Sequence, residues 1–247
     1  MSSKVKITIS VILGVCFILG AVALGVSFYK AKGPQKTISV VGLAQRDFMS
    51  DFIVLDFSYS TQKMDMKEAY EELKSQNEIV KAFLAENKIP ASDITFKAIS
   101  NSTDYDYRYD RKTEESVRIF RGYIFTQEVR IESKSVEAVE LVYQNLIQLL
   151  DKGINVNAYS PDYYYTKLDD LKMAMLAEAT ENAHARAEVI AKNAGASLGG
   201  LKIANAGVFQ ITAPNSSDED YTWGGAFNIS SKPKRATVNM RLTYYVK

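Results

Sequence analysis

The sequence contains very little of the side-chain chemistry that most enzymes use. Its 247 residues include one cysteine, Cys16, and one histidine, His184. A single thiol forms no intrachain disulfide, and a single imidazole cannot build a histidine-rich metal site. Cys16 lies within an apolar N-terminal run, so the rest of the chain has no thiolate for catalysis or metal binding.

An excess of charge of one sign is also lacking. Thirty basic residues are balanced by 29 acidic ones, for a formal net charge of +1. No strong field therefore draws the chain toward a phosphate backbone, and we expect no nucleic-acid partner. Neither a P-loop nor a G-x-G-x-x-G turn occurs, so no phosphate-cradling loop is present. We accordingly expect no cofactor and no enzymatic activity.

The N-terminal segment is the longest apolar run in the chain. No charged residue lies between Ile7 and Tyr29, and as a helix this segment reaches about 34 Å, enough to cross a bilayer. A short basic leader with Lys4 and Lys6 precedes it. Such a first segment normally leaves the leader inside and carries the following domain across, so residues 7–29 are predicted to contact the membrane.

Residues 1–30 are therefore interpreted as a signal anchor or transmembrane helix, 31–36 as a linker containing Pro34, and 37–247 as one α+β domain. The soluble domain is expected outside the cytoplasm, in the periplasm or at the cell surface. Ala21-Val22-Ala23 resembles a signal-peptidase site, so cleavage after Ala23 is the alternative.

Hydrophobic periodicity predicts the element order β-β-α-β-β-α-β-α-β-β after this helix. Strands are predicted at 37–43, 52–59, 94–98, 123–131, 154–158, 201–211 and 234–246, and helices at 65–87, 136–150 and 167–194. Strands adjacent in sequence can pair as hairpins, so the first two strands are expected to pair, as are the two on either side of the charged stretch 111–115. The predicted fold is an antiparallel sheet with helices packed on one face.

The last predicted helix carries a narrow strip of small residues. Four alanines follow one another at four-residue spacing: Ala179, Ala183, Ala187 and Ala191. Residues at this spacing share a helix face, and alanine allows a neighbouring element to approach closely.

Several segments resemble, in order and spacing, the SIMPL-domain family. These are Ile38–Gly42 (I-S-V-V-G) with Asp51, 121–131 (R-G-Y-I-F-T-Q-E-V-R-I), 149–153 (L-L-D-K-G), and the alanine-rich 177–199. Ala44 stands where many members have a second glycine. The resemblance implies an α+β domain similar to bacterial periplasmic oxidative-stress-defence proteins and immunogenic envelope proteins, some of which assemble into large rings. It therefore implies a homo-oligomer or an envelope protein partner.

His184 is the only candidate for imidazole chemistry. Glu181 and Glu188 lie three and four residues away on the same predicted helix, so a surface histidine beside carboxylates is the plain interpretation. The competing hypothesis is a carboxylate-based hydrolase or small-ligand site built on these three residues.

A tyrosine row occurs in the stretch 104–110 (D-Y-D-Y-R-Y-D). As a strand, it places Tyr105, Tyr107 and Tyr109 on one face and the charged residues on the other. As a calcium loop it fails, because Arg108 and Tyr109 stand where an oxygen ligand and glycine are needed. The tyrosines either cover the sheet or form an oligomer contact.

A second tyrosine group and a long loop complete the candidate interface. Tyr163, Tyr164 and Tyr165 are consecutive, and Trp223 lies in the segment 212–231. A loop of this length without secondary structure is often functional, so it is interpreted as either a partner-binding loop or an insertion.

Overall fold

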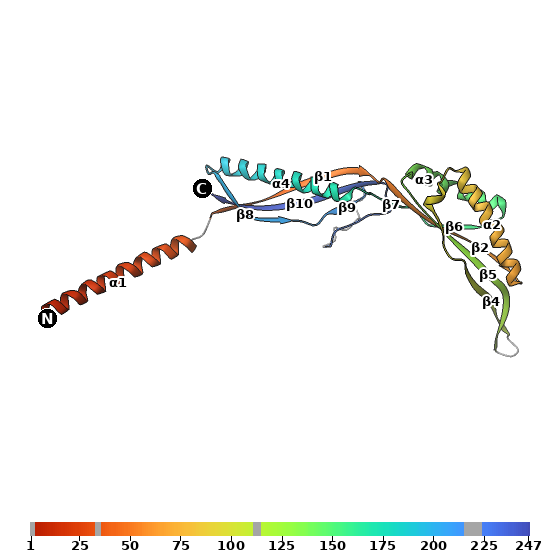
Figure 1. Ribbon diagram of the computed structural model, residues 1–247, viewed down its shortest axis with the longest axis horizontal. Helices are drawn as coiled ribbons and strands as arrows, with labels where there is room; N and C mark the ends of the chain where they lie inside the picture. Colours follow the sequence, from red (N-terminus) through yellow and green to blue (C-terminus); the bar gives the residue numbers. More distant parts are fainter. Residues whose placement is uncertain (1–2, 33–35, 111–114, 215–223) are drawn as a thin grey trace. The chain divides into compact units, whose positions relative to one another are not determined.

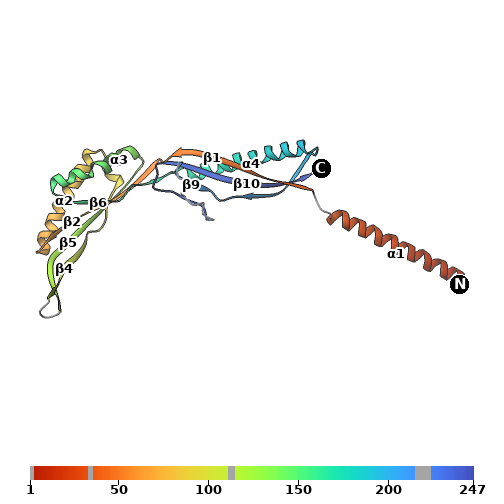
Figure 2. The same ribbon diagram turned by 180° about the vertical axis from the view of Figure 1, so that it is seen from behind.

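The computed structural model describes residues 3–32, 36–110, 115–214 and 224–247 (Figures 1 and 2). The chain forms two compact units, which are described in turn. Unit 1 comprises Met1–Ala44, Leu176–Gly207 and Asn239–Lys247, and unit 2 comprises Gln45–Met175 and Val208–Val238.

The observed order confirms an α+β protein with antiparallel sheets. The elements are α1 (Ser3–Lys32), β1 (Thr37–Met49), β2 (Phe52–Lys63), α2 (Met66–Glu86), η1 (Ala91–Asp93), β3 (Ile94–Phe96), β4 (Ser100–Asp110), β5 (Glu115–Ser133), α3 (Val136–Asn145), η2 (Leu146–Lys152), β6 (Val156–Ala158), β7 (Asp162–Tyr164), α4 (Leu168–Asn193), β8 (Leu198–Ala206), β9 (Gln210–Thr212) and β10 (Pro233–Val246). The three predicted helices are present. β4 and the short strand β7 were not among the predicted strands, and the predicted strand 201–211 joined β8 to the start of β9. Three residues carry too little periodicity to recognise as a separate strand.

Unit 2 is built on a six-stranded sheet in the order β3-β5-β2-β6, with β4 also beside β5 and β7 also beside β2. Asp65 caps the N-terminus of helix α2, and its carboxylate accepts hydrogen bonds from the backbone N–H groups of Lys67 (2.8 Å) and Glu68 (3.0 Å). Its buried residues are Ala69, Leu73, Gln76, Val80, Phe83 and Leu84. Both α2 and α3 pack on one face of this sheet, as predicted.

The core of unit 2 lies between these helices and alternate residues of the two central strands. Ile53, Leu55, Phe57 and Tyr59 of β2 and Phe125, Val129 and Ile131 of β5 belong to it. Gln127 interrupts that series and is buried, but it donates to the carbonyls of Lys97 (2.7 Å) and Glu128 (2.9 Å) and accepts from Asn77 of α2. Because its polar atoms are satisfied, this residue is tolerated at an apolar position.

The predicted hairpin between the first two strands is wrong. β1 pairs with β10 in a separate sheet, whereas β2 pairs with β5 continuously from Ile53–Ser133 to Lys63–Tyr123. β5 occupies one edge of β2, and β6 and β7 occupy the other, so no edge remains for β1. The predicted pairing of 94–98 with 123–131 is confirmed, since β3 pairs with β5 from Ile94–Ile131 to Phe96–Val129. The strand next to the charged stretch is β4, which was not among the predicted strands and pairs with β5 from Ser100–Thr126 to Asp110–Glu115.

Unit 1 contains α4 beside a sheet in the order β1-β10-β8. All four alanines of the strip are buried, at 0 to 1% exposure. Gly42 of β1 lies directly against them, because a Cβ atom there would meet the backbone oxygen of Ala179 and the backbone nitrogen of Ala183. The alanine spacing therefore predicted correctly that another element approaches this helix face closely, and that element is β1. Ala44 lies within β1 and is buried, so no turn occurs at that position.

Candidate functional site

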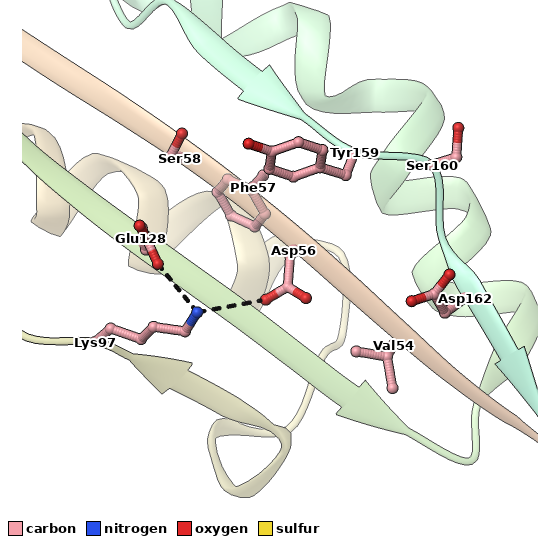
Figure 3. A pocket seen from close by; sticks show the side chains of 9 residues that line it. All are labelled: Val54, Asp56, Phe57, Ser58, Lys97, Glu128, Tyr159, Ser160 and Asp162. Carbon is pink, nitrogen blue, oxygen red and sulfur yellow. Dashed lines mark hydrogen bonds and ion pairs between the residues drawn. The ribbon is translucent and has the colours of Figure 1, made fainter.

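A polar groove lies on the face of the unit 2 sheet opposite α2 and α3, and its volume is about 450 Å³. Four segments build it (Figure 3). Its lining residues are Val54, Asp56, Phe57, Ser58, Lys97, Glu128, Tyr159, Ser160 and Asp162. Strand alternation explains its polarity: residues flanking the core positions of β2 and β5 point to this face.

Ion pairs organise one side of the groove. Lys97 Nζ lies 3.0 Å from Glu128 Oε2 and 4.0 Å from Asp56 Oδ1, and Arg130 Nη1 lies 3.3 Å from Asp56 Oδ2. Asp56 Oδ1 is buried and has no hydrogen-bond donor among the described residues. Arg130 also donates to Glu132 at 2.7 Å, which raises the pKa of its guanidinium. Figure 3 shows Tyr159, Ser160 and Asp162 across the groove from Lys97.

This arrangement suits a small polar ligand better than a metal ion. Three carboxylates and one lysine give the lining an excess of negative charge, and hydroxyl groups of serine and tyrosine add donors and acceptors. Within the described ranges, no three His, Cys, Asp or Glu residues are close enough to hold a metal. The groove therefore favours a ligand carrying a protonated amine and hydroxyl groups.

The cluster around His184 lies on α4 in unit 1. His184 Nε2 is 3.4 Å from Glu188 Oε1, and its Nδ1 is 3.1 Å from the hydroxyl of Tyr244. Burial, and then the charge of Glu188, raise the pKa of Tyr244. The His184 side chain is 49% exposed, and Glu181 is exposed. None of the three predicted residues lines the polar groove described above. The structure thus places this cluster on the helix surface, and Tyr244 is the partner that the sequence did not indicate.

The consecutive tyrosines make contacts within unit 2. The hydroxyl of Tyr163 donates to Glu140 Oε1 at 3.1 Å, Tyr164 lies beside Phe227, and the ring of Tyr165 is 4.8 Å from that of Phe48. All three are half-buried. The three side chains therefore pack on other residues of unit 2. This agrees with the alternative that the tyrosines cover the protein's own sheet.

Stability at high pH should depend on Tyr163. Burial, followed by the bond to Glu140, raises its pKa from 10.0 to about 12. Because the folded state disfavours the phenolate, the contribution of Tyr163 is complete below pH 10 and is lost as the pH rises through 12. Tyr163→Phe should unfold more easily at pH 8, by about 1 kcal/mol, and lose less stability than the wild type between pH 10 and 12.

The measurement is the free energy of unfolding of both proteins across this pH range. Tyr159→Phe, which removes an exposed hydroxyl, is the matched control and should follow the wild-type curve. Parallel curves for Tyr163→Phe and the wild type would contradict the assignment.

The other tyrosine row lies on a two-stranded ribbon formed by β4 and the first part of β5. β2 pairs with β5 only as far as Tyr123, so no third strand among the described residues pairs with 104–110 or 115–122 (Figure 1). Tyr105 is half-buried between Phe120 (5.5 Å between ring centroids) and Arg118, whereas Tyr107 and Tyr109 are 67% and 60% exposed. On the opposite strand, Val117 and Ile119 are also exposed.

Trp223 lies outside the described residues, as does most of the predicted loop. Hydrogen bonds hold the described C-terminal part of that segment against β9. Asn228 donates its backbone N–H to the carbonyl of Ile211 (2.9 Å), and the side-chain oxygen of Gln210 accepts from the backbone N–H of Ala226 (2.7 Å). Part of 212–231 is therefore held against β9, which the sequence indicated only as the end of the predicted strand 201–211.

Helix α1 contains the apolar segment Ile12–Tyr29, with a mean hydropathy of 2.3 and no residue buried by the rest of the protein. Its length and composition are sufficient to cross a membrane, and a signal sequence has the same properties. The predicted N-terminal transmembrane or signal helix is therefore present.

Fold and sites together define an α+β domain that follows an apolar helix in sequence and carries a polar groove and an exposed β-ribbon. Residues 38–243 match the SIMPL family, described as a protein of unknown function (DUF541). The chain belongs to the SIMPL family. No curated protein matches the sequence.

Proposed function

We propose that this chain is a membrane-anchored, extracytoplasmic module of the cell envelope that self-associates or binds an envelope protein and catalyses no reaction. The observation that carries the proposal is the β4–β5 ribbon. It exposes tyrosine and branched apolar side chains, and no third strand in the described part of the chain pairs with it. An isolated two-stranded ribbon is at best marginally stable in water. Aromatic side chains in such a position are typical of protein interfaces.

The apolar helix supports the location. A segment of the length and hydropathy of Ile12–Tyr29 is stable in a bilayer and unfavourable in water. The short basic leader orients the following domain toward the outside. Through its family resemblance the proposal includes a role in stress protection.

Two measurements on the full chain test this function. We expect the protein in the membrane fraction, released by detergent and not by alkaline carbonate, with a tag after Lys247 digested by external protease in intact spheroplasts. In detergent, light scattering should give a mass above that of one chain plus its micelle. A tag protected until lysis would refute the location, and a strict monomer at high micromolar concentration would refute self-association.

The polar groove favours a second candidate function, the binding of a small amine-bearing ligand. We propose glucosamine as a first probe, because it combines a protonated amine with hydroxyl groups, and glucose as its uncharged counterpart. Glucosamine should shift the NMR signals of groove residues more than glucose does, and Asp162→Asn should reduce the shifts. The control is Asp151→Asn, which changes an exposed carboxylate elsewhere in unit 2. Equal responses to both sugars would refute an amine site.

A further inference from the structure

The nearly balanced charge of the whole chain conceals two units of opposite sign. Unit 1 contains ten basic and three acidic residues, for a formal charge of +7, whereas unit 2 contains 20 basic and 26 acidic residues, for a formal charge of −6. The three acids of unit 1, Glu178, Glu181 and Glu188, all belong to α4. The rest of unit 1 therefore carries positive charge alone. Such an asymmetry within one chain favours contact with an anionic surface.

Three exposed lysines lie at one end of unit 1. Lys36 directly precedes β1, and its carbonyl accepts a hydrogen bond from the N–H of Val246 (3.0 Å). Lys247 exchanges two backbone hydrogen bonds of 3.0 Å with Ser197, so the C-terminus lies beside the turn that follows α4 (Figure 1). Lys192 belongs to the last turn of α4. Among the described residues, none of these lysines has an ion-pair partner.

Amphipathic and apolar side chains accompany these lysines. Lys202 Nζ lies 5.3 Å from the ring centroid of Tyr245, which is half-buried near the end of β10. Exposed Val41, Val189 and Ile190 line an apolar groove of about 470 Å³ between β1 and α4. Lysine, tyrosine and branched apolar side chains together are typical of a protein surface that lies among lipid headgroups.

The covalent chain keeps this end of unit 1 close to any membrane that α1 enters. The helix ends at Lys32, and Lys36 is already hydrogen-bonded to the sheet. Four Cα–Cα steps reach at most about 14 Å. The apolar segment of α1 ends at Tyr29, three residues before Lys32, so the lysine-bearing end must lie next to the headgroups of that membrane.

We propose that this end of unit 1 docks through Lys36, Lys192 and Lys247 on anionic phospholipid headgroups of the membrane in which α1 is anchored. The inference rests on the anchoring part of the proposed function and adds a lipid class and a second contact. The negative unit 2 of another copy also complements positive charge. Only the membrane, however, is kept next to these lysines by the chain itself. Glu188, the nearest acid in α4, is balanced by Arg186 two residues earlier.

Fluorescence quenching of the full chain in nanodiscs tests the docking. In a Cys16→Ala background, Ala194→Cys carries the fluorophore, because Ala194 is exposed directly after α4. One nanodisc consists of phosphatidylcholine and the other of an equal mixture with phosphatidylglycerol. Both contain the same fraction of a lipid with a nitroxide headgroup as quencher. The tether acts equally in both, so the difference in quenching measures the charge contact.

We expect stronger quenching in the nanodisc that contains phosphatidylglycerol. The difference should disappear at about 1 M salt, where the Debye length falls to about 3 Å. Each lysine near an anionic surface strengthens binding about fivefold, so loss of three should weaken docking about a hundredfold and also remove the difference. The variant that tests this replaces the three docking lysines: Lys36→Gln/Lys192→Gln/Lys247→Gln.

The matched control removes the same charge from unit 2. It replaces three exposed lysines that form no ion pair with a described residue: Lys74→Gln/Lys134→Gln/Lys152→Gln. This control should be quenched like the wild type in both nanodiscs. If it loses the difference as the unit 1 variant does, total charge and not a docking surface is responsible, and the inference is wrong.

The outcomes separate this inference from the proposed function. A chain that does not enter nanodiscs, or that alkaline carbonate releases from membranes, would overturn the anchor on which both depend. A chain that inserts and is quenched equally in both lipids would overturn the docking and leave the anchor standing. If replacing the docking lysines lowers self-association in phosphatidylcholine and leaves quenching unchanged, the lysines bind a second copy and the lipid assignment is wrong.

Discussion

Replacing Gly42 by valine should abolish the packing of α4 on its sheet. A Cβ atom at this position would lie 2.5 Å from the backbone nitrogen of Ala183 and 2.7 Å from its Cβ, and still closer to the oxygen of Ala179. Backbone atoms of a helix cannot move aside as a flexible side chain can. Overpacking of a core typically costs about 1 to 3 kcal/mol, and a clash with backbone should exceed that range.

Chemical unfolding and hydrogen exchange of the full chain in detergent measure this effect. We expect the free energy of unfolding to fall by about 3 kcal/mol or more and the amides of α4 to exchange faster. Gly200→Val is the matched control, since Gly200 lies in β8 of the same unit with no atom near its added Cβ. It should be neutral or slightly stabilising, because valine favours a strand. An unchanged midpoint for Gly42→Val would contradict the observed helix–strand contact.

The contact at Gly42 also shows what the sequence could reveal about this fold. The alanine spacing on 167–194 marked a helix face that accepts a close neighbour. Periodicity located the long helices and most of the long strands, although it did not locate β4. The choice of strand partner was not accessible in the same way. Whether β1 pairs with β2 or with β10 depends on which edges other strands occupy, and that competition has no local signature.

The candidate sites show the same difference between local features, which the sequence indicates, and long-range contacts, which it does not. Tyr107 and Tyr109 lie on a strand, as alternation around 104–110 indicated, because alternation is a local property. Alternation did not indicate that their side chains are exposed. The polar groove was missed because its residues come from β2, β5, the end of β3 and the β6–β7 connection. Those segments meet only after the sheet has formed. His184 was correctly expected near Glu188, whereas Tyr244 joins it through the pairing of distant strands.

Gly122→Ala should detach the β4–β5 ribbon from the sheet that supports it. Gly122 has φ of 129°, a conformation that side-chain-bearing residues rarely adopt, and an added Cβ would lie 2.5 Å from the carbonyl oxygen of Lys63. The pairing register of β4 with β5 shifts here, between Asp104–Gly122 and Tyr105–Phe120, which is a β-bulge. The backbone strain and the steric contact together should cost about 3 kcal/mol or more.

Because the bulge sets the direction of the ribbon where β2 ends, the largest changes should occur in residues 104–110 and 115–122. We expect their amides to exchange faster and self-association to weaken at least about tenfold, while the core formed by Leu55 and Val129 retains slow exchange. Gly153→Ala is the control, since Gly153 also has positive φ, 78°, but has open space around it. It should cost only about 1 kcal/mol and leave association unchanged. If Gly122→Ala loses ribbon protection yet associates like the wild type, the ribbon is not the surface through which two copies meet.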